Sequence, residues 1–439
     1  MDRQIVKPST LPGFLEWLPA DQIAFNKMMD TIRKNYERYG FIPVDTPVIE
    51  KSEVLLAKGG GDTEKQIYRF TKGDTDLSLR FDLTVPLARF VSQHLGELSF
   101  PFRRYQIGKV YRGERNQKGR FREFYQCDID IIGNGKLNII NDAEIPSIIY
   151  STFTDLGFDS FTIHINNRKV LNGFFDSLGI NNKMETLRIV DKLDKIGMEA
   201  VKGELKEIGL SDEASTKIEE FINIIGSNDE IIEGLKALNI ENEEFVLGLE
   251  ELSQVVYYIR QFGVPDKNFA IDLKIARGLD YYTGTVYETI LNDYPGIGSV
   301  CSGGRYDNLA EYYTTQKLPG VGISIGLSRL FFQLKEAGFF KESTSSTLTK
   351  ILIVPMDENM SYSIGVSNEL KKADIISEVY FEGGKFAKKL NYANKLGIPY
   401  VIIIGEDEIN SGVLTLKDMV KGEQFKLTVV EIINKVRNS

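Results

Sequence analysis

The sequence predicts an α+β protein, and three stretches of the chain carry that prediction. Residues 103–133 form two β-rich runs joined by a short basic loop, which is the pattern of an antiparallel strand pair. Residues 168–262 are charged and helix-rich, with a glycine after each amphipathic piece. After residue 350, strand-like runs alternate with helical ones and end in a hairpin-like segment, which predicts an α/β unit with a mixed sheet.

The remaining elements follow in chain order. A helix is expected over residues 17–39, where apolar side chains recur at helical spacing. Residues 77–95 pass from a strand through a break at Pro86 into a second helix. The glycine triplet at 59–61 could cradle a phosphate, but it lacks the Gly-Lys-Ser/Thr ending of a P-loop, and a surface loop is the alternative.

Length and composition place the chain among globular proteins with several domains. It has 439 residues, 42% hydrophobic and 26% charged, which is ample for sizeable cores. Two cysteines, Cys127 and Cys301, and two histidines are too few for a zinc cluster or a disulfide framework. No apolar run approaches the length of a membrane span and no secretion signal is recognisable, so we expect a cytoplasmic protein.

The charge pattern leaves a nucleic-acid partner open. A net charge of −9 argues against indiscriminate binding to nucleic acids. Residues 103–122 nevertheless form a basic run, and local patches rather than the total charge decide phosphate contact.

One face of the second strand of the hairpin carries polar side chains of mixed type. Because the side-chain period of a strand is two, alternate residues share a side of the sheet. On one side are Arg120, Arg122, Gln126, Asp128 and Asp130. A solvated face is the simple alternative, but such faces are usually lysine and glutamate. Guanidinium groups beside carboxylates and an amide suit a ligand with both phosphate and amine.

Four stretches match known motifs in order along the chain. The first two are YGFIPVDTPVIE (39–50), with a proline at 47, and YRGER followed by a basic loop and REFYQCDIDIIG (111–133). The last two are ARGLDYYTGTVYE (276–288) and GVGISIGLSRL (320–330). Together they resemble motifs 1 and 2, a histidyl-specific signature and motif 3 of the histidyl-tRNA synthetases, a family of class II aminoacyl-tRNA synthetases. The resemblance covers nearly the whole chain.

The resemblance implies a fold and a division into domains. It implies a class II synthetase antiparallel sheet core with a helical insertion and a C-terminal α/β mixed-sheet domain. The core would occupy residues 1–167, with motifs 1 and 2, and residues 263–340, with the RGLDYY stretch and motif 3. The helical insertion would occupy residues 168–262, and residues 350–439 would form an anticodon-binding domain.

The resemblance also implies an activity. Members of the family use ATP and Mg²⁺ to convert L-histidine to histidyl-adenylate, and then transfer histidine to tRNA(His), releasing AMP and diphosphate. They are homodimers. No zinc and no protein-only metal site are expected for this chain, and no membrane association.

Four residues are implied for ATP. Arg112 and Arg277 would contact the α-phosphate as the catalytic cations, since this reaction needs fixed positive charge rather than a nucleophilic side chain. Glu114 would accept a hydrogen bond from the adenine amino group, and Arg329 would stack on the adenine ring. For Arg277 the alternative is a salt bridge to a neighbouring aspartate. Glycines in the strand before Arg329 would let a flat ring approach the backbone, or would serve only tight strand packing.

Six residues are implied for histidine, namely Asp82, Thr84, Gln126, Asp130, Tyr282 and Tyr306. The first three would meet the three donors of the α-ammonium group. Asp130 and the Tyr282 hydroxyl would hold the two imidazole nitrogens, and Tyr306 would close the pocket. A buried polar pair of this kind rejects isosteres strongly, because a wrong side chain leaves its groups unpaired.

Two residues are implied for tRNA, and one position departs from the family pattern. Arg115 and Gln117 match residues that contact the extra guanosine and the discriminator end of tRNA(His), and a mobile basic loop is the alternative. Position 328 is serine where many members carry a carboxylate, which leaves open how one magnesium ion is held.

Two rival interpretations share parts of the pattern. One is a non-catalytic regulatory paralog that partners an ATP phosphoribosyltransferase, but such paralogs usually lack the C-terminal domain and parts of motif 2 or RGLDYY. The other is a glycyl, prolyl or threonyl enzyme of the same class. Threonyl enzymes need zinc, and none of the three carries RGLDYYTG.

Overall fold

The computed structural model describes residues 5–57, 62–114, 119–190, 192–275, 281–340, 346–356 and 360–438. Internal contacts divide the chain into two compact units. One comprises residues 1–15 and 28–339, and the other residues 16–27 and 340–439. The division at residue 28 falls within helix α1 (Pro19–Arg38), which forms where the apolar spacing predicted a helix.

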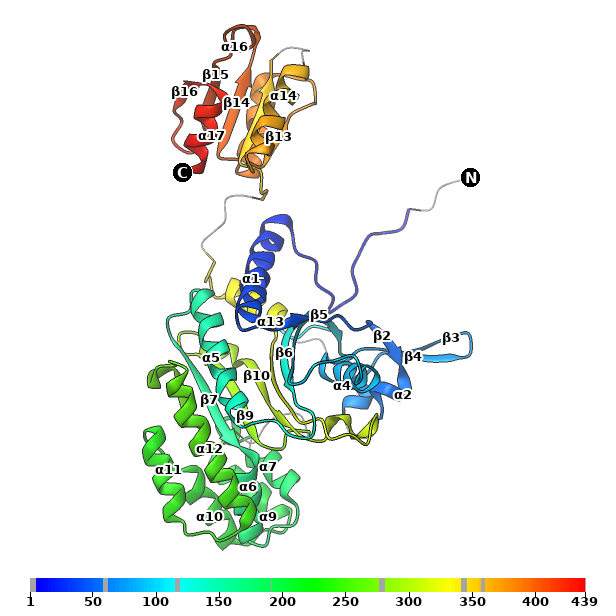
Figure 1. The fold of residues 1–439 in the computed structure, drawn as a ribbon, viewed down its shortest axis with the longest axis vertical. Coiled ribbons are helices and arrows are strands. Elements are labelled where there is room, and N and C mark those ends of the chain that lie inside the picture. Colours follow the sequence, from blue (N-terminus) through cyan, green and yellow to red (C-terminus); the bar gives the residue numbers. More distant parts are fainter. Residues whose placement is uncertain are drawn as a thin grey trace. The chain divides into compact units, whose positions relative to one another are not determined.

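An eight-stranded sheet, counted over the described residues, organises the larger unit (Figure 1). In spatial order its strands are β1 (Ile42–Pro43), β5 (Phe102–Tyr111), β6 (Glu123–Ile132), β11 (Gly320–Ile325), β10 (Ser299–Tyr306), β9 (Thr285–Leu291), β7 (Phe161–Asn167) and β8 (Phe269–Ile271). Only the two edge pairs, β1–β5 and β7–β8, are parallel among these strands. The predicted hairpin is the β5–β6 pair, and the prediction of an antiparallel sheet core is confirmed.

Strand β6 separates the protein core from the opposite, polar face of the sheet. Cys127, Ile129 and Ile131 are completely buried, and the Tyr36 hydroxyl of α1 donates to the Cys127 carbonyl oxygen (3.0 Å). The intervening residues Gln126 and Asp128 point to the other face, as the two-residue period requires.

A smaller sheet and three helices lie between β1 and β5 in the sequence. The sheet has the order β2 (Ile49–Lys51), β4 (Thr75–Leu79), β3 (Arg69–Lys72), and the helices are α2 (Ser52–Leu55), α3 (Asp62–Gln66) and α4 (Thr84–Gln93). The expected break at Pro86 is wrong. Helix α4 already begins at Thr84, and Pro86 lies in its first turn, where the missing N–H would have had no partner within the helix.

Helices dominate residues 168–261, where the insertion is expected. They are α6 (Arg168–Ser177), α7 (Lys183–Val190), α8 (Leu193–Ile196), α9 (Met198–Glu207), α10 (Asp212–Ile222), α11 (Asn228–Ala237) and α12 (Glu243–Gln261). Ser227 caps α11 in a capping box with Glu230, and Asn242 caps α12. These helices gather beside β7 and helix α5 (Ile140–Asp155) at one end of the sheet, within the same compact unit (Figure 1).

Residues after 350 form a second, mixed sheet of order β13 (Ser377–Val379), β12 (Ile351–Pro355), β14 (Tyr400–Ile404), β15 (Leu414–Asp418), β16 (Gln424–Leu427). Pairs β12–β13 and β12–β14 are parallel, and β14–β15–β16 are antiparallel. The helices are α14 (Met360–Lys372), α15 (Phe386–Leu396), α16 (Glu406–Ser411) and α17 (Val429–Arg437). Ile351 and Leu352 belong to different apolar clusters, so β12 is buried on both faces. The predicted mixed-sheet unit is confirmed.

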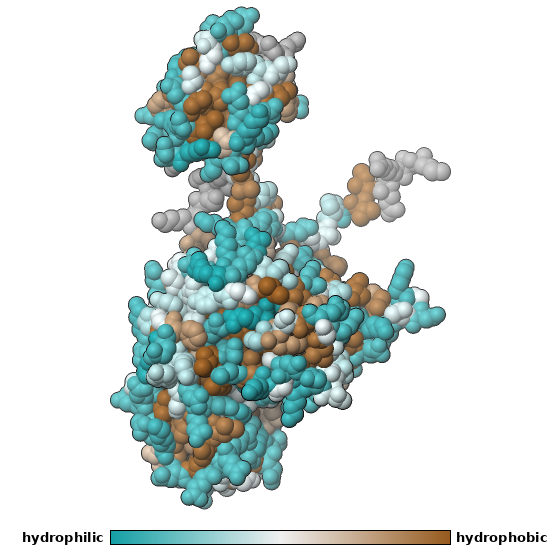
Figure 2. Space-filling view, viewed as in Figure 1, coloured by the Kyte–Doolittle hydropathy of each residue, from teal (hydrophilic) through white to brown (hydrophobic). Residues whose placement is uncertain are grey.

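The surface shows where apolar side chains meet solvent. Exposed large apolar residues of the larger unit include Ile42, Val48 and Ile49, and Figure 2 shows apolar surface among polar side chains around β2. None of the described helices is both long and apolar enough to cross a membrane.

Candidate active site

A cavity of about 400 Å³ opens on the polar face of the large sheet. It gathers side chains from β6, β10 and β11, from the start of α4 and from the segment before β9. The cavity is lined by nine of the twelve site residues that the resemblance implied, namely Asp82, Thr84, Arg112, Glu114, Gln126, Asp130, Tyr282, Tyr306 and Arg329. The other three, Arg115, Gln117 and Arg277, lie outside the described residues.

Glycines on the central strands make room for the polar side chains. Asp130 of β6 lies opposite Gly322 of β11, where a Cβ would come within 2.3 Å of Asp130 Oδ1. A Cβ at Gly320 would come within 2.4 Å of the Tyr306 ring. At these two positions tight packing explains the glycine pattern, whereas Gly326 lines the cavity with no heavy atom within 4 Å of its Cβ position.

Asp130, which lines the cavity, is held from two sides. The Tyr306 hydroxyl donates to its Oδ1 (2.7 Å), and Arg104 Nη2 of β5 pairs with its Oδ2 (2.7 Å). Arg104 is completely buried, and its Nη2 also donates to the Leu83 carbonyl oxygen (3.1 Å). Burial raises the pKa of Asp130 to about 6, against the opposing effect of the Arg104 charge.

The next polar residues along β6 have free hydrogen-bonding capacity. Gln126 Nε2 donates to Ser324 Oγ (2.8 Å), while Gln126 Oε1 is buried without a partner among the described residues. Asp128 Oδ1 is likewise buried and unpartnered within that part of the chain. Burial raises the pKa of Asp128 to about 7; the Arg104 charge lowers it and the neighbouring Asp130 raises it further.

The start of helix α4 supplies two more acceptors. Asp82 Oδ1 accepts from the Val85 N–H (3.0 Å), so the helix end fixes the carboxylate. Burial raises the pKa of Asp82, while the Val85 N–H and the Arg112 charge oppose that shift. Thr84, the first residue of α4, also faces the cavity.

Guanidinium groups also line the cavity. The Arg112 guanidinium carbon is 4.4 Å from the ring centroid of Phe81 and 5.1 Å from that of Phe124, and Arg112 Nε donates to the Phe81 carbonyl oxygen (3.3 Å). Two aromatic faces therefore orient a planar cation. Arg329 Nη2 donates to the Ile297 carbonyl oxygen (2.8 Å), and Glu114 Oε2 lies 3.6 Å from Arg120 Nη1.

The basic run of residues 103–122 is not one surface patch. Arg103 pairs with Glu144 (2.8 Å), Lys109 pairs with Glu123 (2.7 Å), and Arg104 is buried beneath the cavity. Neighbouring residues of a strand point to opposite faces, so sequence adjacency does not give a shared surface here.

Ser328 has a structural contact. Its side chain is buried and its Oγ accepts from the Tyr125 N–H (2.9 Å), which ties α13 (Leu327–Glu336) to β6. Within the described ranges, no group of three or more His, Cys, Asp or Glu side chains is arranged to hold a metal ion.

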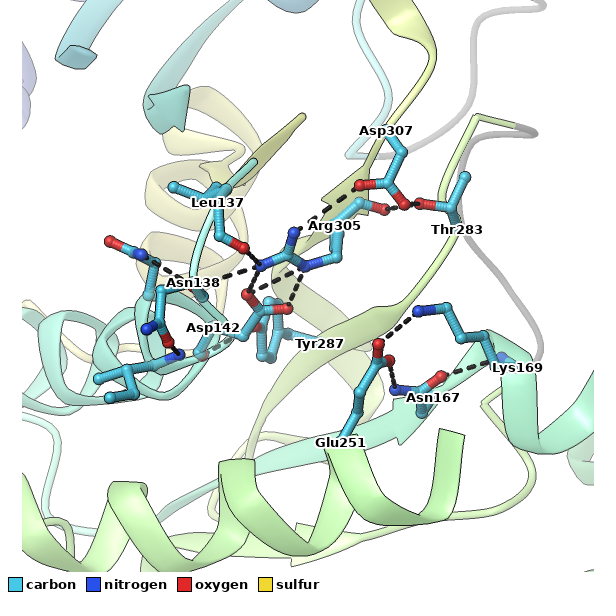
Figure 3. Close-up of polar contacts among 12 residues, drawn as sticks. Leu137, Asn138, Asp142, Asn167, Lys169, Glu251, Thr283, Tyr287, Arg305 and Asp307 are labelled. Carbon is cyan, nitrogen blue, oxygen red and sulfur yellow. Dashed lines mark hydrogen bonds and ion pairs between the residues drawn. The ribbon is translucent and has the colours of Figure 1, made fainter. Parts of the chain in front are cut away.

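A buried ion pair supports the wall of the cavity (Figure 3). Arg305, which precedes Tyr306 on β10, binds Asp142 of α5 through Nε–Oδ1 (3.0 Å) and Nη2–Oδ2 (2.6 Å). The Thr283 N–H donates to the Arg305 carbonyl oxygen (2.8 Å), and its hydroxyl donates to Asp307 (2.5 Å). This network fixes the strand end that carries Tyr306 to the segment that follows Tyr282.

The sequence analysis did not assign a role to several residues at or beneath the cavity. Arg104, Asp128 and Tyr281 are the main examples, together with the Arg305–Asp142 pair. The hairpin register offers a signal for the first of them, because Arg104 lies directly opposite Asp130.

Comparisons with known proteins agree with this fold. The family described as "Histidyl-tRNA synthetase" matches residues 13–330, and the family described as "Anticodon binding domain" matches residues 350–439. The histidine–tRNA ligase of Clostridium tetani is 65% identical over 439 residues, covering all of both chains. That of Clostridium acetobutylicum is 52% identical over 97% of this chain and 99% of its own. The crystal structure of histidyl-tRNA synthetase from Nostoc sp. PCC 7120 has a TM-score of 0.92 at 42% identity, covering 99% of this chain and 100% of that one.

The antiparallel sheet core is thus that of a class II aminoacyl-tRNA synthetase. Within that class, the chain belongs to the histidyl-tRNA synthetase family. The prediction of a histidine–tRNA ligase is confirmed at this level.

Proposed function

We propose that the cavity activates L-histidine with ATP and Mg²⁺ and then transfers histidine to tRNA(His). The observation that carries the proposal is the lining of one cavity, where buried hydrogen-bond acceptors and guanidinium groups lie together. That arrangement suits a substrate with an ammonium group and an imidazole joined to a nucleotide phosphate.

In the first step, a carboxylate oxygen of histidine forms a bond to the α-phosphorus of ATP, and the bond from that phosphorus to the pyrophosphate oxygen breaks. Negative charge is redistributed on the non-bridging oxygens, so fixed cations stabilise the transition state. Arg112 is proposed for this role because its guanidinium is held between Phe81 and Phe124 before substrate binds. Arg277 is proposed as a second cation on the resemblance alone.

The histidine end of the cavity provides acceptors for the substrate's donors. Gln126 Oε1 has no partner among the described residues, and Asp82 retains an oxygen beyond the one that Val85 occupies. With Thr84 they offer three acceptors to the α-ammonium group. Asp130 and the Tyr282 hydroxyl are proposed for the imidazole, with Tyr306 orienting Asp130.

Mg²⁺ supplies positive charge to the phosphates when it is bound with ATP. Ser328 offers it no carboxylate, and its hydroxyl oxygen accepts from the Tyr125 N–H. The described side chains fit an ion held mainly by the ATP phosphates, with Glu114 as a carboxylate that lines the cavity. Glu114 is also proposed to accept from the adenine amino group, and Arg329 to stack on the ring.

The remaining assignments concern partners, domains and location. Residues 350–439 are proposed to bind the anticodon arm of tRNA(His), and Arg115 and Gln117 its acceptor end. The helical insertion is proposed as residues 168–262, between core segments 1–167 and 263–340.

A homodimer is proposed, and it is supported by the exposed Ile42, Val48 and Ile49 in the motif 1 region. A cytoplasmic location is proposed because both cysteines are free thiols, and free thiols are typical of proteins in a reducing compartment.

The proposal is tested by amino-acid-dependent exchange of pyrophosphate into ATP. The purified chain is expected to catalyse exchange with histidine and with none of the other standard amino acids. A protein that exchanged with another amino acid and not with histidine would contradict the assignment.

Asp130→Asn is expected to impair histidine use far more than ATP use. The change removes a buried charge that faces the imidazole site and not the nucleotide end. A hydrogen bond to a charged group contributes about 1.5–3 kcal/mol, so a KM for histidine raised about 10- to 100-fold is expected. The KM for ATP serves as the internal control. Equal effects on both substrates would remove Asp130 from the histidine site.

A further inference from the structure

We infer that Asp128 is a second carboxylate of the histidine site, whose free Oδ1 shares the imidazole N–H of the substrate with Asp130. The inference deepens the proposed function and rests on it. It assigns substrate recognition to a residue that the family resemblance left without a role.

Asp128 lies between two residues that are proposed to bind the substrate. On β6 it follows Gln126 and precedes Asp130 on the same face, and all three line the cavity. Residues two apart on a strand are about 6.6 Å apart, so Asp128 lies within the span of a single bound amino acid.

The carboxylate oxygens of Asp130 and Asp128 differ in whether they already have a protein partner. Both oxygens of Asp130 already have a protein partner, Tyr306 at Oδ1 and Arg104 at Oδ2. Asp128 Oδ1 is buried and has no partner among the described residues. A buried carboxylate oxygen without a donor is costly, and a substrate N–H would satisfy it.

The donors of histidine indicate which group of the substrate Asp128 contacts. The three donors of the α-ammonium group are already matched by Asp82, Thr84 and Gln126. The donor of histidine that remains is the imidazole N–H, and Asp128 lies two positions from Asp130 on β6, where both line the cavity. Asp128 is therefore placed with the residues proposed to surround the imidazole.

The protonation of Asp128 responds to many neighbours. The charged groups that act on it are Arg80, Arg104, Arg112, Asp82 and Asp130. Nearby groups that burial keeps neutral at pH 7 are Tyr36, Tyr282, Cys127 and Cys301. With a pKa of about 7, Asp128 is partly protonated in the empty cavity at neutral pH. Accepting a hydrogen bond favours the ionised form, so histidine binding is expected to release part of a proton from it.

The first experiment compares Asp128→Asn with the unaltered full-length chain. The variant keeps the shape of the side chain, and its KM for histidine is expected to rise about 10- to 100-fold while that for ATP changes less than about twofold. The inhibition constant of imidazolepropionate, which has the ring but no ammonium group, is expected to rise by a similar factor. Asp418→Asn, a buried carboxylate of the smaller unit, is the matched control and should leave exchange kinetics unchanged.

The outcomes separate the inference from the proposed function. If the unaltered chain shows no histidine-dependent exchange, the proposed function and this inference both fail. If it does, and Asp128→Asn leaves the histidine KM unchanged or weakens histidine without weakening imidazolepropionate, only the inference fails. Loss of histidine and ATP use together would show a purely structural residue and would also overturn it.

A second measurement compares proton release on binding. Histidine binding to the unaltered chain and to Asp128→Asn at pH 7 is followed by calorimetry in phosphate and in Tris, whose ionisation enthalpies differ. The imidazole of histidine also titrates near this pH, so the variant supplies the reference. The unaltered chain is expected to release more protons than the variant, and equal release by the two proteins would overturn the inference.

Discussion

Arg305→Met is expected to lower the free energy of unfolding by about 3–5 kcal/mol, because it leaves the fully buried carboxylate of Asp142 without its partner. Arg305 satisfies both oxygens of that carboxylate and also donates to the Leu137 carbonyl oxygen (3.2 Å). Burial raises the pKa of Asp142, and the Arg305 charge opposes that shift. Urea unfolding of the two proteins measures the difference.

Arg260→Met is the matched control for that change. Arg260 makes ion pairs with Asp229 (2.9 Å) and Asp266 (2.8 Å), but both carboxylates are largely exposed to solvent. An exposed pair contributes about 1 kcal/mol or less. The double variant Arg305→Met, Asp142→Leu should recover part of the lost stability, since no unpaired charge remains. Equal losses for Arg305→Met and Arg260→Met would show that the buried pair is not a main support of the cavity wall.

The elements of the fold were predictable where polar and apolar side chains repeat at the spacing of a strand or a helix. The alternation along β6 placed Gln126 and Asp130 on one face, and they do line one cavity. The alternation does not extend to Arg122, because β6 begins only at Glu123. Arg122 Nε instead donates a hydrogen bond to the Glu114 carbonyl oxygen (3.0 Å). Local periodicity thus predicts which side chains share a face, and only within the strand itself.

The supporting residues were not predictable because they depend on pairing between distant segments. Arg104 looked like part of a basic patch, and only its register opposite Asp130 reveals a buried ion pair. Arg305 and Asp142 are 163 positions apart, and no local pattern connects them. Buried charges are tolerated only with a partner, so an arginine within an apolar strand indicates that a carboxylate exists, although not where it lies.

The ATP residues differ in how their assignments arose. Arg112 and Arg329 were assigned by resemblance, and the structure brings both to the cavity with aromatic Phe124. Composition and spacing alone would not have distinguished Arg112 from Arg103, whose guanidinium lies over Phe41 and pairs with Glu144. Location decides between them, since Arg112 lines the cavity and Arg103 does not.

Arg112→Ala is expected to slow histidyl-adenylate formation by about 10²–10³, with modest changes in the KM for histidine and for ATP. The guanidinium is held by the Phe81 and Phe124 rings before substrate binds, so it stabilises developing charge without reorganisation. Removing one such preorganised group typically costs about 3–4 kcal/mol in the transition state. Single-turnover measurement of adenylate formation separates this effect from product release. Arg277→Ala, at the other cation proposed for the α-phosphate, is expected to slow the same step.

Two further variants decide whether Arg112 acts on the phosphate or only supports the fold. Arg112→Lys should restore only part of the rate, because a point charge cannot reproduce the planar fork that binds two phosphate oxygens. A purely structural role predicts instead that adenylate formation and thermal stability fall together in Arg112→Ala. Arg260→Ala, at an exposed ion pair of the helical region, should leave single-turnover rates unchanged. Unchanged adenylation in Arg112→Ala would mean that the α-phosphate does not approach this guanidinium, and the orientation proposed for ATP would have to be reversed.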